Sequence, residues 1–280
     1  MAPPRRFAQA GYTIPGMMLR EVFLLTPFLA HYDKLSCLEV GGNTGLWLEA
    51  FFNIFGPRVA DYGVYEPLPG NLAQLRGTLE KRVRGAERVT VRPWCAGDKP
   101  GEVVLNYDAD VSALASVLLP EVKLVGGKVH RNDRQITVKQ ERLDERITEI
   151  VHFMKIDTEG HEWAVLEGAS SAIERGLARN VLFEFGIHQN ALGQSFKQFF
   201  EIFRDNGYSI YRQISRGHFF GYGAIEKARW FDETRGQQYM VLASLDGPSA
   251  GYRGPAVVRG DDWRERMALE VLYRVGGVRT

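Results

Sequence analysis

The feature that most constrains the fold is a regular alternation, between residues 36 and 244, of short apolar runs with stretches of helical apolar spacing. Strand-like runs occupy residues 36–40, 63–67, 88–96, 152–157 and 181–188. Helical spacing follows at residues 44–55, after Pro69, at 162–175 and at 195–205. This order predicts an α/β fold, because parallel strands need crossover connections and the helices of those connections cover both faces of the sheet.

Two regions depart from this alternation. Residues 98–150 hold strand-like pieces, EVVLNY and QITVKQ, around a Gly-rich charged segment without a clean crossover helix, so we interpret them as an elaboration. The segments SIYRQI and QYMVLASL predict a terminal antiparallel pair of strands. The expected domain therefore spans residues 36–245.

The two ends of the chain fall outside this domain. We expect residues 1–35 to form a helical segment that packs beside the sheet or covers the site. Residues 246–280 begin with a Gly/Pro-rich linker and end in a predicted amphipathic helix near 261–275, with apolar residues at i, i+4 and i+8 from Trp263. That apolar stripe is core-facing or dimer-forming, so a homodimer is among our expectations.

Charge and cysteine content narrow the class of protein. The 35 Lys and Arg residues nearly balance the 34 Asp and Glu residues, which predicts neither a nucleic-acid partner nor a membrane partner. The start of the chain lacks the apolar stretch of a signal peptide, and the apolar residues 22–30 are too short to span a bilayer. Cys37 and Cys95 lie in apolar runs, which predicts buried thiols in a reducing compartment, so we expect a cytoplasmic protein.

A glycine-rich turn follows the first predicted strand. Gly41, Asn43 and Gly45 predict a tight strand-to-helix turn that a ligand can approach closely. Glu66 ends the next strand, where an acid meets ribose hydroxyls in nucleoside-binding sheets. The acid Glu39 directly before the turn would repel a pyrophosphate, whereas S-adenosylmethionine carries an ammonium and a sulfonium. The pattern favours S-adenosylmethionine over a dinucleotide.

A second acidic segment, KIDTEGHE, follows the strand at 152–157. Alternation places Lys155 and Asp157 on one face, with Asp157 at the carboxyl edge of the sheet. We expect Asp157 to orient the methionyl end of the cofactor or the acceptor hydroxyl, and Lys155 to pair with a neighbouring carboxylate. Glu159 and Glu162 also have a simpler explanation, since acids in the first turn of a helix complement its dipole.

The strand at 181–188 adds Glu184 and His188, which strand alternation would place on one face. Methyl transfer to an alcohol needs a base, and His188, His161 or Asp157 could supply it. A histidine at a strand end is nevertheless more often a surface histidine or one whose hydrogen bonds are satisfied. The same side chains, together with Glu159, could hold a divalent cation, but no compact ligand motif demands one and a metal is not favoured.

Several blocks of the sequence resemble a known family: LEVGGNTG, VYEPLPGNLAQL, CAGDKPGEV, FMKIDTEGHEWAVLEGA and VLFEF. They resemble the FkbM-type methyltransferases, which depend on S-adenosylmethionine and mostly O-methylate natural products and glycans. The resemblance covers residues 36–186 and implies a Rossmann-like class I methyltransferase fold with a seven-stranded, mostly parallel sheet and an antiparallel terminal strand.

The resemblance also implies a cofactor site. Asp157 would face the transferring methyl group, and Glu66 would bind the ribose. The remaining implied residues are Glu39, Gly41, Gly42, Asn43 and Gly45 at the methionyl part, Pro67 and Asn71 beside Glu66, and Cys95 and Ala96 at the adenine. The family usually has Asp-Val-Gly-Ala where this chain has Glu-Val-Gly-Gly at 39–42, a longer acid and one more glycine.

These observations predict an O-methyltransferase acting on a sugar or secondary metabolite in natural product biosynthesis. N-methylation of an amino sugar or another amine is the main alternative, and a nicotinamide-dependent reductase or a non-catalytic nucleoside-binding module is disfavoured. We expect acceptor choice to depend on residues 1–35, residues 106–140 and the aromatic segment 218–231, which could equally be a hydrophobic cover.

Overall fold

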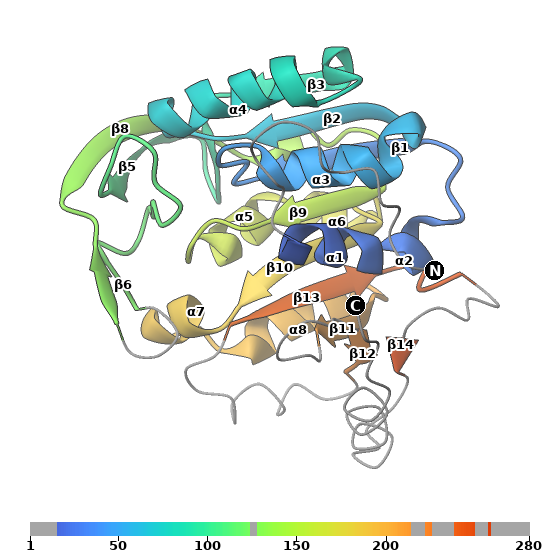
Figure 1. Ribbon diagram of the computed structural model, residues 1–280. Helices are drawn as coiled ribbons and strands as arrows, with labels where there is room; N and C mark the ends of the chain where they lie inside the picture. Colours follow the sequence, from blue (N-terminus) through green and yellow to red (C-terminus); the bar gives the residue numbers. More distant parts are fainter. Residues whose placement is uncertain (1–15, 124–127, 214–221, 226–237, 250–256, 259–280) are drawn as a thin grey trace, which may run out of the picture.

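The computed structural model describes residues 16–123, 128–213, 222–225, 238–249 and 257–258 of the 280-residue chain. It shows a layered α/β architecture in which one central sheet carries helices on both faces (Figure 1). The predicted helix near 261–275 lies outside the described residues, as does most of the aromatic segment 218–231.

Five parallel strands form the half of the sheet that carries the candidate site. In spatial order they are β3 (Val89–Arg92), β2 (Val59–Tyr65), β1 (Leu35–Val40), β9 (Phe153–Ile156) and β10 (Asn180–Phe185). The register places Glu39 of β1 level with Lys155 of β9. The strand order reverses at β1, and open α/β sheets bind ligands at the carboxyl ends of the strands at such a switch point.

Beyond β10 the next strands of the sheet are antiparallel. Strand β13 (Tyr239–Ser244) pairs with both β10 and β11 (Ser209–Gln213), which confirms the predicted terminal pair. The expected seven-stranded class I methyltransferase sheet is therefore present. Two short strands, β12 (Tyr222–Ala224) and β14 (Val257–Val258), extend it beyond β11.

Helices cover the two faces because successive strand residues point to opposite sides. Phe153 packs on one side, against α1 (Gly16–Leu24), α2 (Thr26–Leu29), α3 (Leu46–Phe55) and α4 (Pro69–Arg82). Met154 packs on the other side, against α5 (Glu162–Gly168), α6 (Ser170–Glu174) and α8 (Phe196–Arg204). None of the helices in the described part of the chain has the length and apolar character needed to cross a membrane.

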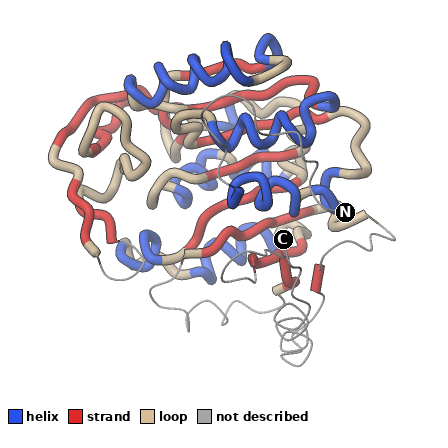
Figure 2. Tube along the Cα trace, viewed as in Figure 1, coloured by secondary structure: helices blue, strands red, loops and turns tan. Residues whose placement is uncertain are grey.

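The elaboration after β3 consists of strands and loops (Figure 2). It contains a three-stranded sheet of β4 (Cys95–Ala96), β8 (Arg134–Glu141) and β5 (Gly101–Tyr107), and a hairpin of β6 (Glu121–Lys123) and β7 (Val129–Arg131). The short 3-10 turns η1 (Gly56–Arg58) and η2 (Ala86–Arg88) lie before the elaboration, directly ahead of β2 and β3. A further 3-10 turn, η3 (Leu143–Glu145), follows β8. The chain returns through η3 to the central sheet at β9.

Three sequence predictions differ from the structure. The expected strand at 88–96 is two strands in different sheets, because Pro93, which has no N–H to donate, separates β3 from β4. The expected helix at 162–175 divides into α5 and α6 at Ala169, next to Gly168, where an added Cβ would lie 1.9 Å from the Gly97 carbonyl oxygen. The expected strand at 181–188 ends at Phe185, and α7 (Ile187–Ala191) begins two residues later.

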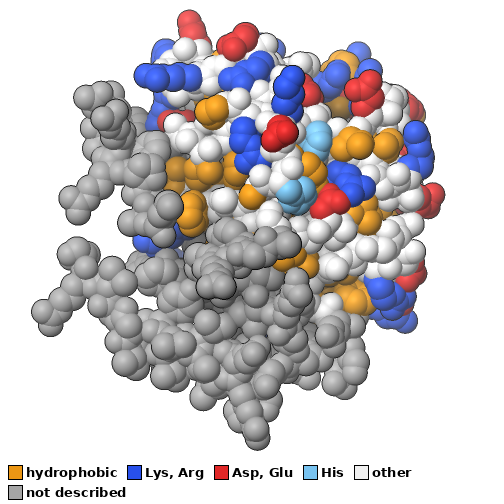
Figure 3. Space-filling view, turned by 90° about the vertical axis from the view of Figure 1, so that its right-hand side faces the viewer, with side chains coloured by type: hydrophobic (Ala, Val, Ile, Leu, Met, Phe, Trp, Pro, Cys, Tyr) orange, Lys and Arg blue, Asp and Glu red, His pale blue; other side chains and the backbone are white. Residues whose placement is uncertain are grey.

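Surface charge and cysteine burial agree with the sequence analysis. Positive, negative and apolar side chains are interspersed on the described part of the face in Figure 3, as the formal net charge of +1 suggests. Cys37 and Cys95 are both free and buried, which confirms the prediction of buried thiols.

Candidate active site

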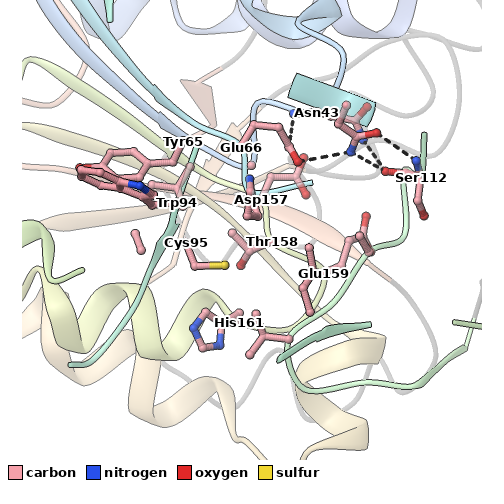
Figure 4. Close-up of a pocket in the computed structure, with 18 of the residues that line it drawn as sticks. Asn43, Tyr65, Glu66, Trp94, Cys95, Ser112, Asp157, Thr158, Glu159 and His161 are labelled. Atoms are coloured by element: carbon pink, nitrogen blue, oxygen red, sulfur yellow. Dashed lines mark hydrogen bonds between the residues drawn. The ribbon is translucent and has the colours of Figure 1, made fainter. Parts of the chain in front are cut away.

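A pocket lies at the carboxyl edge of the parallel strands (Figure 4). Its wall combines the turn after β1, the start of the β2–α4 connection, residues 94–96, part of residues 112–117 and the loop after β9. Segments far apart in the sequence therefore build one cavity at the switch point of the sheet.

The glycine turn is shaped by close backbone contacts. Gly41 has a φ of +87°, and a Cβ added there would lie 1.8 Å from the carbonyl oxygen of Asp157. A Cβ on Gly42 would lie 2.4 Å from the Val64 side chain, so the second glycine permits close packing on β2. Asn43 adopts a φ of 48° and Gly45 a φ of +80°, completing a turn that L side chains rarely adopt.

Glu66 is bound directly to this turn. Its carboxylate accepts hydrogen bonds from the backbone N–H groups of Asn43, at 2.7 Å, and Leu68, at 2.9 Å. Burial raises the pKa of Glu66 to about 7, although these hydrogen bonds act in the opposite direction. Pro67 and Asn71 line the pocket beside this acid. The predicted ribose-binding residues are therefore brought together in one wall.

Asp157 lines the pocket and pairs with a buried lysine. Lys155, only 3% exposed, places its Nζ 2.8 Å from Asp157 Oδ2 and 3.9 Å from Glu39 Oε1. Burial alone would lower the pKa of Lys155, but these two carboxylates hold it above its ordinary value. The predicted structural role of Lys155 agrees with this geometry.

Glu39 lies behind the pocket wall. Its side chain is fully buried, and the Tyr62 hydroxyl donates a hydrogen bond to Oε2 at 2.8 Å. The neighbouring residues Val40 and Gly41 line the pocket instead. Glu66 and Asp157 thus meet in the wall, whereas Glu39 reaches Asp157 only through Lys155, and its contact with a cofactor stays a prediction.

The burial of Glu39 predicts a pH-dependent stability. Burial raises the pKa of Glu39 to about 7, so the native state holds a proton that the unfolded state has released. Stability should therefore fall as the pH rises from about 5 to 8, by up to ~3 kcal/mol from this group. Urea unfolding of Glu39→Gln should show a weaker pH dependence than the wild type. An equal dependence in both proteins would contradict the assignment.

The acids after Asp157 differ in what they contact. Glu162 is fully buried and accepts hydrogen bonds from the backbone N–H groups of Thr158, at 2.7 Å, and Gly160, at 3.0 Å, so it holds the loop in shape. Glu159 lines the pocket, and its Oε2 lies 3.2 Å from Nδ1 of His188. Only Glu159 of these two offers its side chain to a ligand.

His188 lies beside Glu159, at a position that strand alternation does not predict. The prediction that it shares a strand face with Glu184 is wrong, because β10 ends at Phe185 and His188 lies in α7. The two side chains still come together, since the Gln238 amide nitrogen lies 2.9 Å from Glu184 Oε2 and 3.1 Å from His188 Nδ1. The short helix after Gly186 thus places His188 near Glu184.

His161 lines another part of the pocket, together with Cys95 and Ala96. Its Nε2 lies 3.0 Å from Oε1 of Gln140, whose amide nitrogen donates to the Lys99 carbonyl. Nε2 therefore carries the proton, and burial lowers the pKa of His161 to about 4. A neutral histidine with so low a pKa is a weak general base.

The spacing of the ligand atoms permits a metal ion without requiring one. One atom each from Glu159, Glu184 and His188 lie within 4.8 Å of one another, as do atoms of Asp157, Glu162 and Glu184. Glu162 already binds backbone N–H groups, and Asp157 already binds Lys155. The first group is the better candidate for a cation.

Sequence analysis assigned acceptor choice to residues 106–140 in part, but it named no individual residue of this segment in the wall. Asn71 binds both peptide groups of Ser112, accepting from its N–H at 2.9 Å and donating to its carbonyl at 2.7 Å. The Ser116 hydroxyl donates to the Glu159 carbonyl at 2.7 Å. Trp94 also lines the pocket. These contacts join distant segments, so no local sequence pattern could have revealed them.

The sheet order, the glycine turn and the acid-lined pocket at the switch point agree with a class I methyltransferase fold. The family model described as the methyltransferase FkbM domain matches residues 39–210 of this sequence. The chain therefore belongs to the FkbM methyltransferase family, as the resemblance predicted.

Comparison with solved structures found several similar chains. A methyltransferase FkbM from Methylobacillus flagellatus KT is 18% identical, with 75% of this chain and 44% of that chain covered and a TM-score of 0.48. The chain thus spans less than half the length of that protein. A precorrin-6y C5,15-methyltransferase from Geobacter metallireducens GS-15 is 17% identical, with 85% and 93% covered and a TM-score of 0.42. No curated protein sequence matched the chain.

Proposed function

We propose that this chain is an S-adenosylmethionine-dependent methyltransferase that O-methylates a hydroxyl of a small molecule, a sugar or a secondary metabolite. The observation that carries the proposal is the meeting of Glu66, Asp157 and the glycine turn in one pocket of an FkbM domain. S-adenosylmethionine would supply a methyl group already activated on a sulfonium. The protein then needs to align the acceptor and accept its proton.

The positions of the side chains in the wall support that task. Glu66 is held by Asn43 and Leu68 at a position where it can accept hydrogen bonds from ribose hydroxyls. Cys95 and Ala96 provide a buried surface for the base. Asp157, oriented by Lys155, presents a negative charge toward the cationic end of the cofactor.

The charge of the wall argues against a dinucleotide. Among the described residues that line the pocket, three are Asp or Glu and none is Lys or Arg. A pyrophosphate there would face carboxylates without a compensating cation, which is unfavourable. The same acidic wall supports N-methylation of an amine as the second candidate, because carboxylates would bind the ammonium form of the acceptor and could take up the proton that it loses before its lone pair attacks the methyl group.

Calorimetry tests the cofactor assignment. S-adenosylhomocysteine should bind, and NAD should not, because only the former lacks phosphates. Binding of NAD alone would overturn the proposal, and binding of neither ligand would contradict a nucleoside site.

The acceptor requires a separate experiment. Candidate sugars and secondary metabolites incubated with S-adenosylmethionine should gain one methyl group by mass spectrometry, and fragmentation should place it on oxygen. Matched hydroxyl and amino sugars separate the two candidate reactions, and methylation of only the amine would replace the first by the second. A cytoplasmic location and a homodimer built through residues 261–275 stay predictions.

A further inference from the structure

One segment of the elaboration crosses the pocket from one wall to the other. Residues 108–119, which we call the strap, lie between β5 and β6. Ser112 contacts Asn43 at the wall that holds Glu66, and Ser116 contacts the backbone of Glu159 in the loop after β9 (Figure 4). Between and beside these contacts the strap contributes four residues to the pocket lining: Ser112, Ala113, Ala115 and Val117.

The first contact fixes the strap to the start of α4. Asn71 accepts from the Ser112 N–H at 2.9 Å and donates to the Ser112 carbonyl at 2.7 Å. A Cβ added to Gly70 would lie 1.6 Å from the Asp110 carbonyl oxygen, so the strap lies directly on the helix. Asn71 also donates to Glu66 Oε1 at 3.4 Å. The strap is therefore joined to the acid that would bind the ribose.

The second contact fixes the strap to the loop that carries Asp157. The Ser116 hydroxyl donates to the Glu159 carbonyl at 2.7 Å and accepts from the Leu119 N–H at 3.2 Å. Asn132, which is 5% exposed, supports this end by donating to the carbonyls of Leu114, at 2.9 Å, and Leu119, at 3.3 Å. Ser116 and Asn132 hold the strap without lining the pocket.

Hydrogen bonds hold the strap more than apolar packing does. Ser112 and Ser116 are buried, whereas Val111 and Leu118 keep 38% and 43% exposure. Within the strap, which the structure describes throughout, Leu119 is the only buried apolar side chain. A segment with few buried apolar contacts opens at a lower free-energy cost than core strands, and each hydrogen bond adds little net stability. The strap can therefore open while the central sheet stays folded.

We propose that the strap is a gate that opens as a unit to admit the cofactor and to release its product. The inference rests on the proposed function. In the closed form Ala113, Ala115 and Val117 cover a ligand that lies between the Glu66 wall and the loop after β9. Exchange of the cofactor then passes through the open form. Ser116 and Asn132 are positioning residues that set how often this form occurs.

Hydrogen exchange followed by NMR tests the opening without a ligand. In the wild type the Ser112 amide should exchange well before the most protected amides of β1, because the strap opens without global unfolding. This amide binds Asn71 and not Ser116, so it reports whether the two contacts open together. In Ser116→Ala it should exchange roughly 3- to 10-fold faster, the effect of one lost hydrogen bond. Unchanged exchange there would contradict opening as a unit.

Binding kinetics test the gate itself. Stopped-flow fluorescence with S-adenosylhomocysteine gives the association and dissociation rates separately, and Trp94 in the pocket lining provides a signal. Ser116→Ala weakens the closed form of the free and the bound protein alike. Both rates should therefore rise by the same factor, roughly 3- to 10-fold, while the dissociation constant stays nearly constant. A fixed wall would leave the association rate as it is in the wild type.

A control and a second variant complete the test. Thr137→Ala removes an exposed hydroxyl from β8 of the same elaboration and should keep both wild-type rates. If Ser116→Ala does not fold, Asn132→Ala removes two hydrogen bonds to the strap and should raise both rates.

The outcomes separate the two proposals. An association rate equal to that of the wild type, or a faster dissociation alone, would overturn the gate. If S-adenosylhomocysteine does not bind the wild type, the proposed function fails, and hydrogen exchange still decides whether the strap opens.

Discussion

Turnover should fall by roughly 10²–10⁴-fold when Asp157 is replaced by asparagine, because the variant loses the charge that aligns the cationic end of the cofactor with the acceptor. The amide oxygen introduced in Asp157→Asn can still accept a hydrogen bond from Lys155. Lys155 also retains its other partner, Glu39, whose Oε1 lies 3.9 Å from Nζ. We therefore expect the free energy of unfolding to change far less than the activation free energy.

Two measurements check this result. Steady-state rates with the acceptor found by mass spectrometry give the loss of turnover, and urea unfolding gives the loss of stability. The control Asp205→Asn changes an acid with a 61% exposed side chain outside the pocket and should keep wild-type rates. Wild-type turnover in Asp157→Asn would remove this acid from the mechanism, whereas a collapse of stability would make its role structural.

Lys155→Met should produce the largest loss of stability among the substitutions considered. The variant leaves Glu39 fully buried without a nearby cation and removes the partner of Asp157. Removing one member of a buried ion pair costs about 3–5 kcal/mol, because the remaining charge stays desolvated. The same protein should also lose cofactor binding, since Lys155 orients Asp157 in the pocket wall.

The loss should depend on pH with a defined sign. Burial raises the pKa of Glu39 to about 7 in the wild type, and removal of Lys155 raises it further. At pH 5 the Glu39 carboxyl is then protonated and tolerates the loss of the lysine, so Lys155→Met should be less destabilised at pH 5 than at pH 8.

Urea unfolding at both pH values, beside a matched variant, tests this expectation. Lys197 is 69% exposed and pairs with Glu201 at 3.7 Å on the surface of α8, so Lys197→Met should cost under ~1 kcal/mol at either pH. Equal losses in the two variants would show that the Lys155 pair does not matter for stability.

The arrangement of the parallel strands followed from local patterns. Short apolar runs separated by helical spacing located β1, β2, β9 and β10 because burial on both faces requires such runs. The glycines at 41 and 45 marked the turn for a similar local reason, since their positive φ excludes most other residues. The acids at strand ends could be placed at one edge because parallel strands share their direction.

Side-chain contacts between segments could not be predicted in this way. The expected strand at 88–96 is interrupted at Pro93, and His188 lies in α7 and not in a strand. The assumption of strand alternation therefore failed where the chain changed direction. The covering of the pocket by residues 112–117 depends on contacts such as Asn71 with Ser112, which lie 41 residues apart.

The sequence by itself determined the class of sheet, the glycine turn and the presence of Glu66 and Asp157 at its carboxyl edge. Only the tertiary structure decided that Glu39 lies behind the wall with Lys155, and that Glu159 faces the pocket with His188 at its back. Strand and turn preferences act over a few neighbouring residues, so the local sequence determines them. The direction in which a buried charged side chain points is set by the partners that compensate its charge, and those partners come from distant segments.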